Sequence, residues 1–149
     1  MKLCFFVGHR DAPETIRPAL EQAVWRHIEE HGVRRFVVGN HGNFDRMARQ
    51  VLTEAKKRHP DLDLRLAVPY PPGVRPVSLP RGFDGVYFPP ELEGAPSRGA
   101  AARLDRLLLE QATHLIAYVV YVSVDSYKLL VSARERAQQG LLVLTELRG

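Results

Sequence analysis

Two short segments of the sequence combine glycines with polar side chains in a way that suits an anionic ligand. They are residues 8–10, Gly-His-Arg, and residues 39–45, Gly-Asn-His-Gly-Asn-Phe-Asp. Glycines let an anion approach the backbone closely, and the amide hydrogens at the start of a helix attract negative charge. Arg10 adds a permanent positive charge that grips two oxygens of a phosphate. Asn40 and Asp45 offer bonds to a base or to sugar hydroxyls. The two segments therefore predict a site for phosphate and sugar.

The glycine pattern is short and leaves an alternative open. Gly39 and Gly42 form only a G-x-x-G, and the chain has neither the G-x-G-x-x-G of dinucleotide-binding folds nor the G-x-x-x-x-G-K-S/T of the P-loop. Glycines also serve tight turns, so the alternative is a pair of turns with solvated polar side chains. The spacing of His9, His41 and Asp45 fits no standard metal motif, so we expect neither a metal nor another cofactor.

Histidine and aspartate also raise the question of catalysis. The ordinary pKa of a histidine lies in the range that a general base needs, so His9 is a candidate, and Asp45 is the other candidate acid or base. The sequence indicates no nucleophile beside them, so the catalytic residues stay unknown. The remaining histidines are predicted to lie on helix surfaces or at helix ends, with structural roles; they are His27, His31, His59 and His114.

The elements that would position these segments alternate along the chain. Short apolar runs predict strands at residues 2–7, 35–38, 62–68, 86–88, 115–122 and 141–144. Apolar residues at helical spacing predict helices at residues 14–30, from 42 or 43 to the residue before Pro60, from a cap at Ser97 through Leu108, and at 126–139. This order indicates an α/β fold: one three-layer, Rossmann-like domain over residues 1–149 with a mainly parallel, doubly wound sheet.

Residues 69–96 interrupt the alternation. They hold eight of the eleven prolines and predict a long loop within the domain. In a doubly wound sheet, ligands bind beyond the carboxyl ends of the strands, where the winding reverses. The first strand is the natural central strand and the second should lie beside it. We therefore expect segments 8–10 and 39–45 to face each other at the same edge of the sheet.

Composition excludes several classes of protein. The chain has 149 residues, of which 45% are hydrophobic and 26% charged, a balance typical of a globular domain. A single cysteine, Cys4, excludes an internal disulfide and a cysteine-rich zinc site. No apolar run approaches the roughly 20 residues of a membrane span, and the first residues are too short for a signal peptide. We expect a cytoplasmic protein with no membrane partner.

The charge of the chain bears on its partners. The formal net charge is +4, and only four of the 21 basic residues are lysines. The arginines suit a small phosphorylated ligand, although codon bias is the simpler explanation for their number. Basic residues are scattered among acidic ones and form no basic run with aromatics, so nucleic acid is an improbable partner. Trp25 and the proline-rich loop offer apolar material for a homodimer.

The motifs resemble those of a known group of proteins. Residues 5–10, Phe-Phe-Val-Gly-His-Arg, are similar to the F-x-G-H-R start of small bacterial proteins in the SLOG superfamily, which gathers Rossmann-like domains of the DNA-processing protein A and lonely-guy types. The similarity continues through residues 37–40, 42–45, 83–89, 105–106 and 114–118. Its better-known members bind nucleotides or their derivatives, and the lonely-guy enzymes cleave the base from a nucleoside monophosphate. The resemblance implies a ligand edge lined by Gly8, His9, Arg10, Gly39, Asn40, Gly42 and Asp45, with Arg106 approaching from the third helix.

The chain departs from that pattern at one place. Relatives carry a Gly-Gly pair after the late strand, where the backbone cradles phosphate, whereas this chain has Tyr127-Lys128 in the stretch 124–128. The glutamate that is catalytic in the lonely-guy enzymes is missing as well. Three interpretations remain. They are a sensor-type domain for a nucleotide or its derivative with phosphate at the two segments, a hydrolase that cleaves the glycosidic bond of a nucleoside monophosphate, and a scaffold without a ligand. The departures favour the first over the second.

Overall fold

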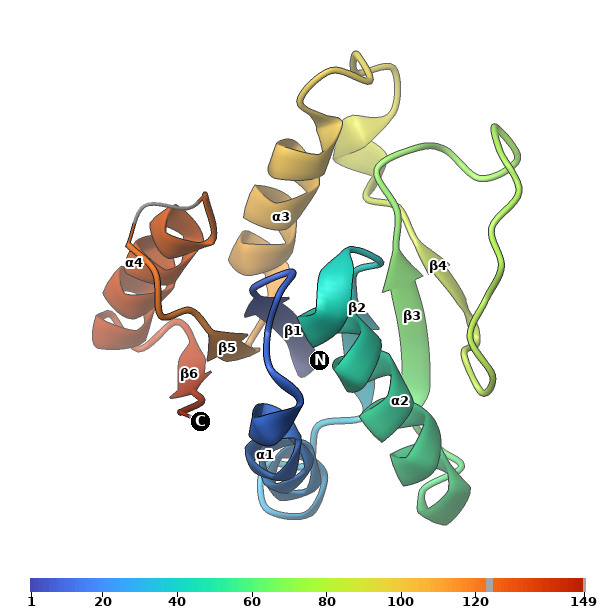
Figure 1. The fold of residues 1–149 in the computed structure, drawn as a ribbon. Helices are drawn as coiled ribbons and strands as arrows, with labels where there is room; N and C mark the ends of the chain where they lie inside the picture. Colours follow the sequence, from blue (N-terminus) through green and yellow to red (C-terminus); the bar gives the residue numbers. More distant parts are fainter. Residues whose placement is uncertain (123–124, 149) are drawn as a thin grey trace.

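The centre of the structure, a computed structural model that describes residues 1–122 and 125–148, is one parallel sheet. Within these residues the sheet has six strands in the order β4-β3-β2-β1-β5-β6 (Figure 1). The strands are β1 (Leu3–Gly8), β2 (Arg35–Val38), β3 (Asp63–Ala67), β4 (Gly85–Tyr87), β5 (His114–Tyr118) and β6 (Val143–Glu146). The predicted three-layer, Rossmann-like α/β fold is confirmed.

Helices cover both faces of the sheet. They are α1 (Arg17–Glu29), α2 (Gly42–Arg58), α3 (Ala100–Gln111) and α4 (Asp125–Gln138). On β1, Cys4 and Phe6 pack with α1 and α2, while Leu3, Phe5 and Val7 pack with α3 and α4. Because both faces of the strand are buried, its sequence is apolar throughout rather than alternating.

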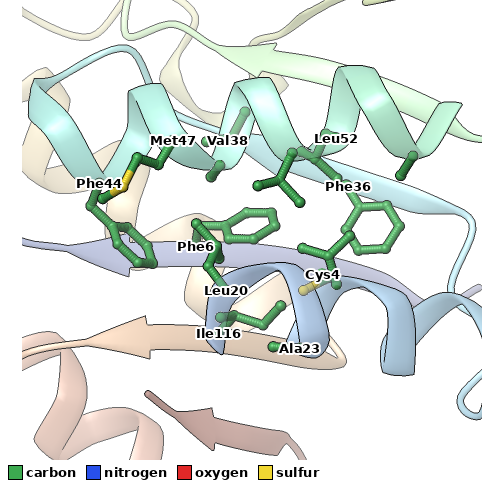
Figure 2. Packing of buried hydrophobic residues seen from close by; sticks show 14 of the residues in the cluster. Cys4, Phe6, Leu20, Ala23, Phe36, Val38, Phe44, Met47, Leu52 and Ile116 are labelled. Carbon is green, nitrogen blue, oxygen red and sulfur yellow. The ribbon is translucent and has the colours of Figure 1, made fainter. Parts of the chain in front are cut away.

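The core between the sheet and the first two helices holds the strand ends in place. Figure 2 shows Phe6 and Phe36, on neighbouring strands, between Leu20 of α1 and Leu52 of α2. The two phenylalanine ring centroids lie 6.2 Å apart, and none of these four side chains is more than 2% exposed. Burying a side chain of this size stabilises the fold by about 1.5–3 kcal/mol. The core therefore fixes β1 and β2, which carry the two glycine-bearing segments.

The direction of winding changes beside β1. The chain proceeds from β1 through β2 and β3 to β4 at one edge, then returns by way of α3 to β5 on the other side of β1. Because β1 and β2 are parallel neighbours, Gly8 and Gly39 emerge at the same edge of the sheet, as predicted. The reversal between β1 and β5 marks the point at which such sheets bind ligands.

Three predicted boundaries were wrong. Ser97 does not cap α3, because Gly99, with a φ of 77°, is the last residue before the helix. That left-handed conformation suits glycine and sets the start of the helix at Ala100. The strand predicted at residues 115–122 ends at Tyr118, and residues 120–122 are exposed. The last strand lies two residues later than predicted, at β6.

The proline-rich segment 69–96 is held to the rest of the fold near its middle. It contains β4, as predicted, and a 3-10 turn at Pro90–Leu92 that the sequence did not indicate. Lys56 of α2 forms an ion pair of 2.6 Å with Asp84, and the Thr53 hydroxyl donates to the carbonyl of Arg81. In the described residues, no helix is both long enough and apolar enough to cross a membrane.

Candidate functional site

A cavity of about 750 Å³ opens at the carboxyl ends of β1 and β5, where the winding of the sheet reverses. Segments that follow β1, β2, β3 and β5 form its walls together with the start of α3 and of α4. The predicted site residues that line it are Gly8, His9, Arg10, Gly39 and Asp45. Asn40, Gly42 and Arg106 are not among its lining residues, and Asp105 contributes to the wall beside Arg106.

The two glycine-bearing segments contact each other through their backbones. The amide of Asn43 donates to the carbonyl of Arg10 at 2.8 Å, and the amide of Phe44 is 3.4 Å from the carbonyl of His9. The side-chain amide of Asn43 donates to the carbonyl of Ala12 at 2.5 Å. The segments lie side by side as expected. However, these two amide hydrogens at the start of α2 are donated to neighbouring carbonyls rather than left free for an anion.

The glycines of the motif serve this contact. A Cβ added at Gly8 would lie 2.2 Å from the ring of Phe44, and one added at Gly42 would lie 2.4 Å from the Cα of Arg10. Gly42 also has a φ of +86°, which other residues rarely adopt. The Gly-x-Phe-Asp motif therefore joins the segment after β2 to the segment after β1. This part of the pattern follows the alternative interpretation, in which glycines serve turns and close packing.

His9 connects the two strands at the reversal. The imidazole is buried, and its Nε2 accepts the backbone N–H of Val120 at 2.8 Å. An Nε2 that accepts a hydrogen bond carries a lone pair, so the ring hydrogen lies on Nδ1. Burial lowers the pKa of His9, and the nearby charge of Asp11 only partly opposes this. His9 is thus a neutral group that positions the segment after β5, and its Nε2 is not free to act as a base.

Asp45 lies in the first turn of α2, where the two segments meet. Its Oδ2 accepts the backbone N–H of His41 at 3.0 Å, and the same oxygen would lie 2.7 Å from a Cβ added at Gly39. Burial raises the pKa of Asp45 to about 6. The neighbouring carboxyl of Asp105 raises this pKa further, whereas the His41 hydrogen bond and the charge of Arg49 oppose the rise.

A second carboxyl, that of Asp105 on α3, belongs to the same cavity. Burial raises its pKa to about 6 as well. The sequence interpretation selected Arg106, but one residue along a helix turns the side chain by about 100°, and Arg106 is exposed. Helical spacing could have identified Asp105 as a site residue. It lies four residues after Ala101, on the same face of α3, and both line the cavity.

Charged groups around the cavity are mostly acidic. Of the residues that the structure describes, Asp11, Asp45, Asp105 and Asp125 line it together with one arginine, Arg10. Arg10 is exposed, and in the part of the chain that the structure describes it takes part in no salt bridge within 4.0 Å. This balance suits a ligand that has hydroxyl or amine donors and at most a small anionic group. A chain of phosphates would meet repulsion from the carboxylates.

An aromatic ring completes the wall on the side of β5. Tyr121 is 52% exposed although it lines the cavity, and its ring centroid lies 4.6 Å from that of His9. The flat face of an aromatic side chain is a general platform for a base or sugar ring. Sequence reasoning placed Tyr121 within a buried strand and so missed it as a site residue.

The stretch 124–128, which the sequence resemblance aligns with a Gly-Gly pair, also reaches the cavity. Asp125 and Ser126 line it at the start of α4, while Tyr127 is half-buried and Lys128 is exposed. Val124, the first residue of that stretch, lies outside the described residues. The carboxyl of Asp125 makes this wall acidic rather than a cradle for phosphate.

The prediction that the remaining histidines lie on helix surfaces or at helix ends was wrong for His114, which lies in a strand, and His27 lies in the last turn of its helix but not on the surface. His27 is fully buried within α1, and His114 is buried at the first position of β5. His59 directly follows α2 as predicted, with its ring centroid 5.4 Å from that of Trp25. Trp25 is half-buried, which agrees with the sequence interpretation.

A separate cavity of about 690 Å³ lies between α1, α2 and the proline-rich segment. Arg17 and Arg46 in its wall are both bound to Glu14. Because these arginines already have an anionic partner and the strand ends lie elsewhere, the candidate site is the cavity at the reversal. No family model matches the chain, and a comparison with curated proteins gives no match.

Proposed function

We propose that the cavity binds a nucleoside or a small nucleotide derivative and that the protein acts as a binding or sensor domain. The observation that carries the proposal is a pair of half-buried carboxyls, Asp45 and Asp105, that line the same cavity as Arg10. Carboxylates accept hydrogen bonds from the adjacent hydroxyls of a ribose, and an arginine fork binds a phosphate group. Tyr121 offers a face for the base.

The charge balance narrows the class of ligand. Four aspartates against one arginine favour a nucleoside, a nucleoside monophosphate or a sugar derivative over a di- or triphosphate. The volume of about 750 Å³ falls within the range of cavities that hold small molecules. The resemblance of segments 5–10 and 42–45 to the SLOG superfamily supports the nucleotide class, and we propose membership of that superfamily on these motifs.

A thermal-shift screen tests the proposal directly. Because a ligand that binds only the folded state raises the melting temperature, nucleosides, nucleoside mono-, di- and triphosphates and nucleotide sugars are compared at equal concentration. We expect the largest shift with a nucleoside, its monophosphate or a sugar derivative, and a smaller shift for Asp105→Asn with the same compound. If no compound in the panel changes the melting temperature, the binding proposal is rejected and the scaffold interpretation is favoured.

A second candidate function, hydrolysis of the glycosidic bond of a nucleoside monophosphate, is favoured by one observation. The pKa values of Asp45 and Asp105 both lie at about 6, so around pH 6 each carboxyl is partly protonated and the pair can supply both an acid and a base. In that reaction water adds to the anomeric carbon and loses a proton to the carboxylate. The C–N bond breaks, and the departing base takes a proton from the carboxylic acid. The products are the free base and ribose 5-phosphate.

Release of free base distinguishes the two candidates. Wild-type protein is incubated with each nucleoside monophosphate, and the products are separated by chromatography. Enzyme activity requires that release stops in Asp45→Asn and in Asp105→Asn even at nucleotide concentrations high enough to saturate each variant. Binding without any release of base in the wild-type protein rejects hydrolysis and leaves the binding domain.

A further inference from the structure

Three histidines gather at the edge of the sheet opposite the cavity. His27 lies near the end of α1, His31 follows that helix, and His114 is the first residue of β5. Their ring centroids form a nearly equilateral triangle with sides of 5.1 Å between His27 and His31, 5.4 Å between His27 and His114, and 5.2 Å between His31 and His114. The first two are four residues apart in the sequence, and the third is brought to them only by the fold.

Hydrogen bonds leave one nitrogen of His27 free. Its Nδ1 lies 2.6 Å from the carbonyl oxygen of Ala23, which is only an acceptor, so Nδ1 carries the ring hydrogen. Nε2 therefore has a lone pair, yet it is fully buried and has no hydrogen-bond partner. Buried polar atoms are nearly always paired, so an orphaned lone pair in a histidine cluster points to a missing electrophilic partner.

His114 is held in the same way. Its Nδ1 lies 2.8 Å from the hydroxyl oxygen of Thr113, and that hydroxyl lies 3.2 Å from the carbonyl of Leu3. With the hydroxyl hydrogen donated to this carbonyl, Nδ1 of His114 carries the ring hydrogen and Nε2 has the lone pair. A histidine ligand of a metal typically donates its other ring N–H to a carbonyl or similar acceptor, which fixes the ring. Both histidines have that second contact.

The size of the triangle matches three imidazoles on one tetrahedral ion. Nitrogen–metal distances of about 2.0–2.1 Å place the centroids of neighbouring imidazoles about 5 Å apart. In the described residues, no group of three or more His, Cys, Asp or Glu side chains is arranged to hold a metal ion as it stands. A rotation is therefore required. His31 is free to supply it, because its ring is half-buried and makes no hydrogen bond within the described part of the chain.

We propose that His27, His31 and His114 bind one divalent transition-metal ion of the zinc class. His27 and His114 supply two lone pairs held in place by Ala23 and Thr113, and His31 turns inward to complete the site. Neutral imidazoles suit Zn²⁺ and Co²⁺, and water occupies the fourth position of the ion. The bound ion joins the end of α1 to the start of β5, independently of the ligand cavity.

Lys2 supplies an electrostatic check on this site. Its ammonium donates to the carbonyl of His31 and lies close enough to His114 to lower the pKa of that residue, after the larger effects of burial and of the two other histidines. A positive charge at that distance opposes a cation. Lys2→Ala should therefore bind the metal more tightly than the wild-type protein, whereas removal of a ligand should weaken binding.

The test uses tag-free protein that has been treated with a chelator, and titrates it with Co²⁺ while visible absorption is recorded. We expect one equivalent to bind with the absorption of a tetrahedral site. His31→Ala should weaken binding by at least about tenfold, the loss that even an outer-shell partner of a ligand causes. Competition by Zn²⁺ should remove the absorption, and Zn²⁺ should raise the melting temperature of the wild-type protein.

His59→Ala is the matched control, because His59 also follows a helix and is half-buried but lies outside the triangle. Its affinity for Co²⁺ should equal that of the wild-type protein. Since the ring of His31 is held by no hydrogen bond in the described residues, His31→Ala should keep its circular dichroism spectrum even if variants of the buried histidines do not fold. Wild-type protein that takes up no Co²⁺, or that binds it equally well without His31, overturns the proposal.

Discussion

The imidazole of His9 accepts a hydrogen bond from the backbone N–H of Val120, which lies 111 residues later in the sequence. This contact joins the segment after β1 to the segment after β5 at the reversal of the sheet. The ring of Tyr121, next in sequence, lies against the same imidazole. One side chain thus positions both the backbone and the aromatic surface on this side of the cavity.

Replacement of His9 by alanine should lower the free energy of unfolding. Val120 would lose the acceptor of its amide and a buried ring would leave a gap, so we expect a loss of about 2–4 kcal/mol. His9→Gln offers an acceptor of similar reach and should recover part of the loss. Urea unfolding followed by circular dichroism measures both. Equal losses in the two variants would show that ring packing, and not the hydrogen bond, is the stabilising contact.

Gly8→Ala should destabilise the protein because the new methyl group would overlap the ring of Phe44. Crowding of this kind in a packed interior costs about 1–3 kcal/mol. Phe44→Leu removes ring atoms from that space, so the double variant should lose less than the sum of the two single losses. Gly85→Ala is the control, because only the mobile end of Arg65 lies near its Cβ position. Strict additivity of the two changes would contradict the contact between the segments.

The sequence was sufficient to predict that Gly8 and Gly39 lie at the same edge of the sheet, because neighbouring parallel strands place their carboxyl ends together. It could not predict that Arg10 and His9 accept the amides at the start of α2, since this depends on how two loops meet. The prediction of Arg106 as a site residue was wrong by one position, because the neighbouring Asp105, and not Arg106, lines the cavity. His27 and His114 escaped notice because only the fold brings the end of α1 to the start of β5.

Stability should depend on pH through Asp105. Burial raises its pKa to about 6, above the value of roughly 3.9 for an unfolded chain, so the folded state binds more protons between these values. The folded state is therefore favoured by Asp105 protonation at low pH, and stability falls as pH rises from about 4 to about 6. Asp105→Asn should be more stable than wild type by about 1–2 kcal/mol above pH 7, with the difference shrinking toward pH 4.5.

Asp84→Asn is the control of opposite sign for this pH dependence. Although burial alone would raise the pKa of Asp84, hydrogen bonds from Lys56 and from the amide of Leu64 lower it below its usual value. Its ionised form stabilises the folded state, and that stabilisation is lost as pH falls. Asp84→Asn should thus be less stable than wild type above about pH 4. Urea unfolding at several pH values measures both variants, and parallel curves for Asp105→Asn and wild type would contradict the burial of that carboxyl.

Arg10 should contribute to the binding of nucleoside monophosphates but not of nucleosides. Among the described residues it is the one arginine that lines the cavity. A charge-assisted contact with phosphate is worth about 1.5–3 kcal/mol, so Arg10→Ala should weaken binding of a monophosphate by roughly 10- to 150-fold. The affinity for the corresponding nucleoside should stay the same, because the sugar and base meet Asp45, Asp105 and Tyr121 instead.

Arg106→Ala is the matched control for Arg10→Ala, because it removes an equal charge from an exposed position of α3 that lies outside the cavity. Calorimetry measures the affinity of both variants for the nucleoside and for its monophosphate. An equal loss of affinity in Arg10→Ala and Arg106→Ala would attribute the effect to the general charge of the protein. An equal loss of nucleoside and nucleotide affinity in Arg10→Ala would show that the phosphate does not bind near Arg10.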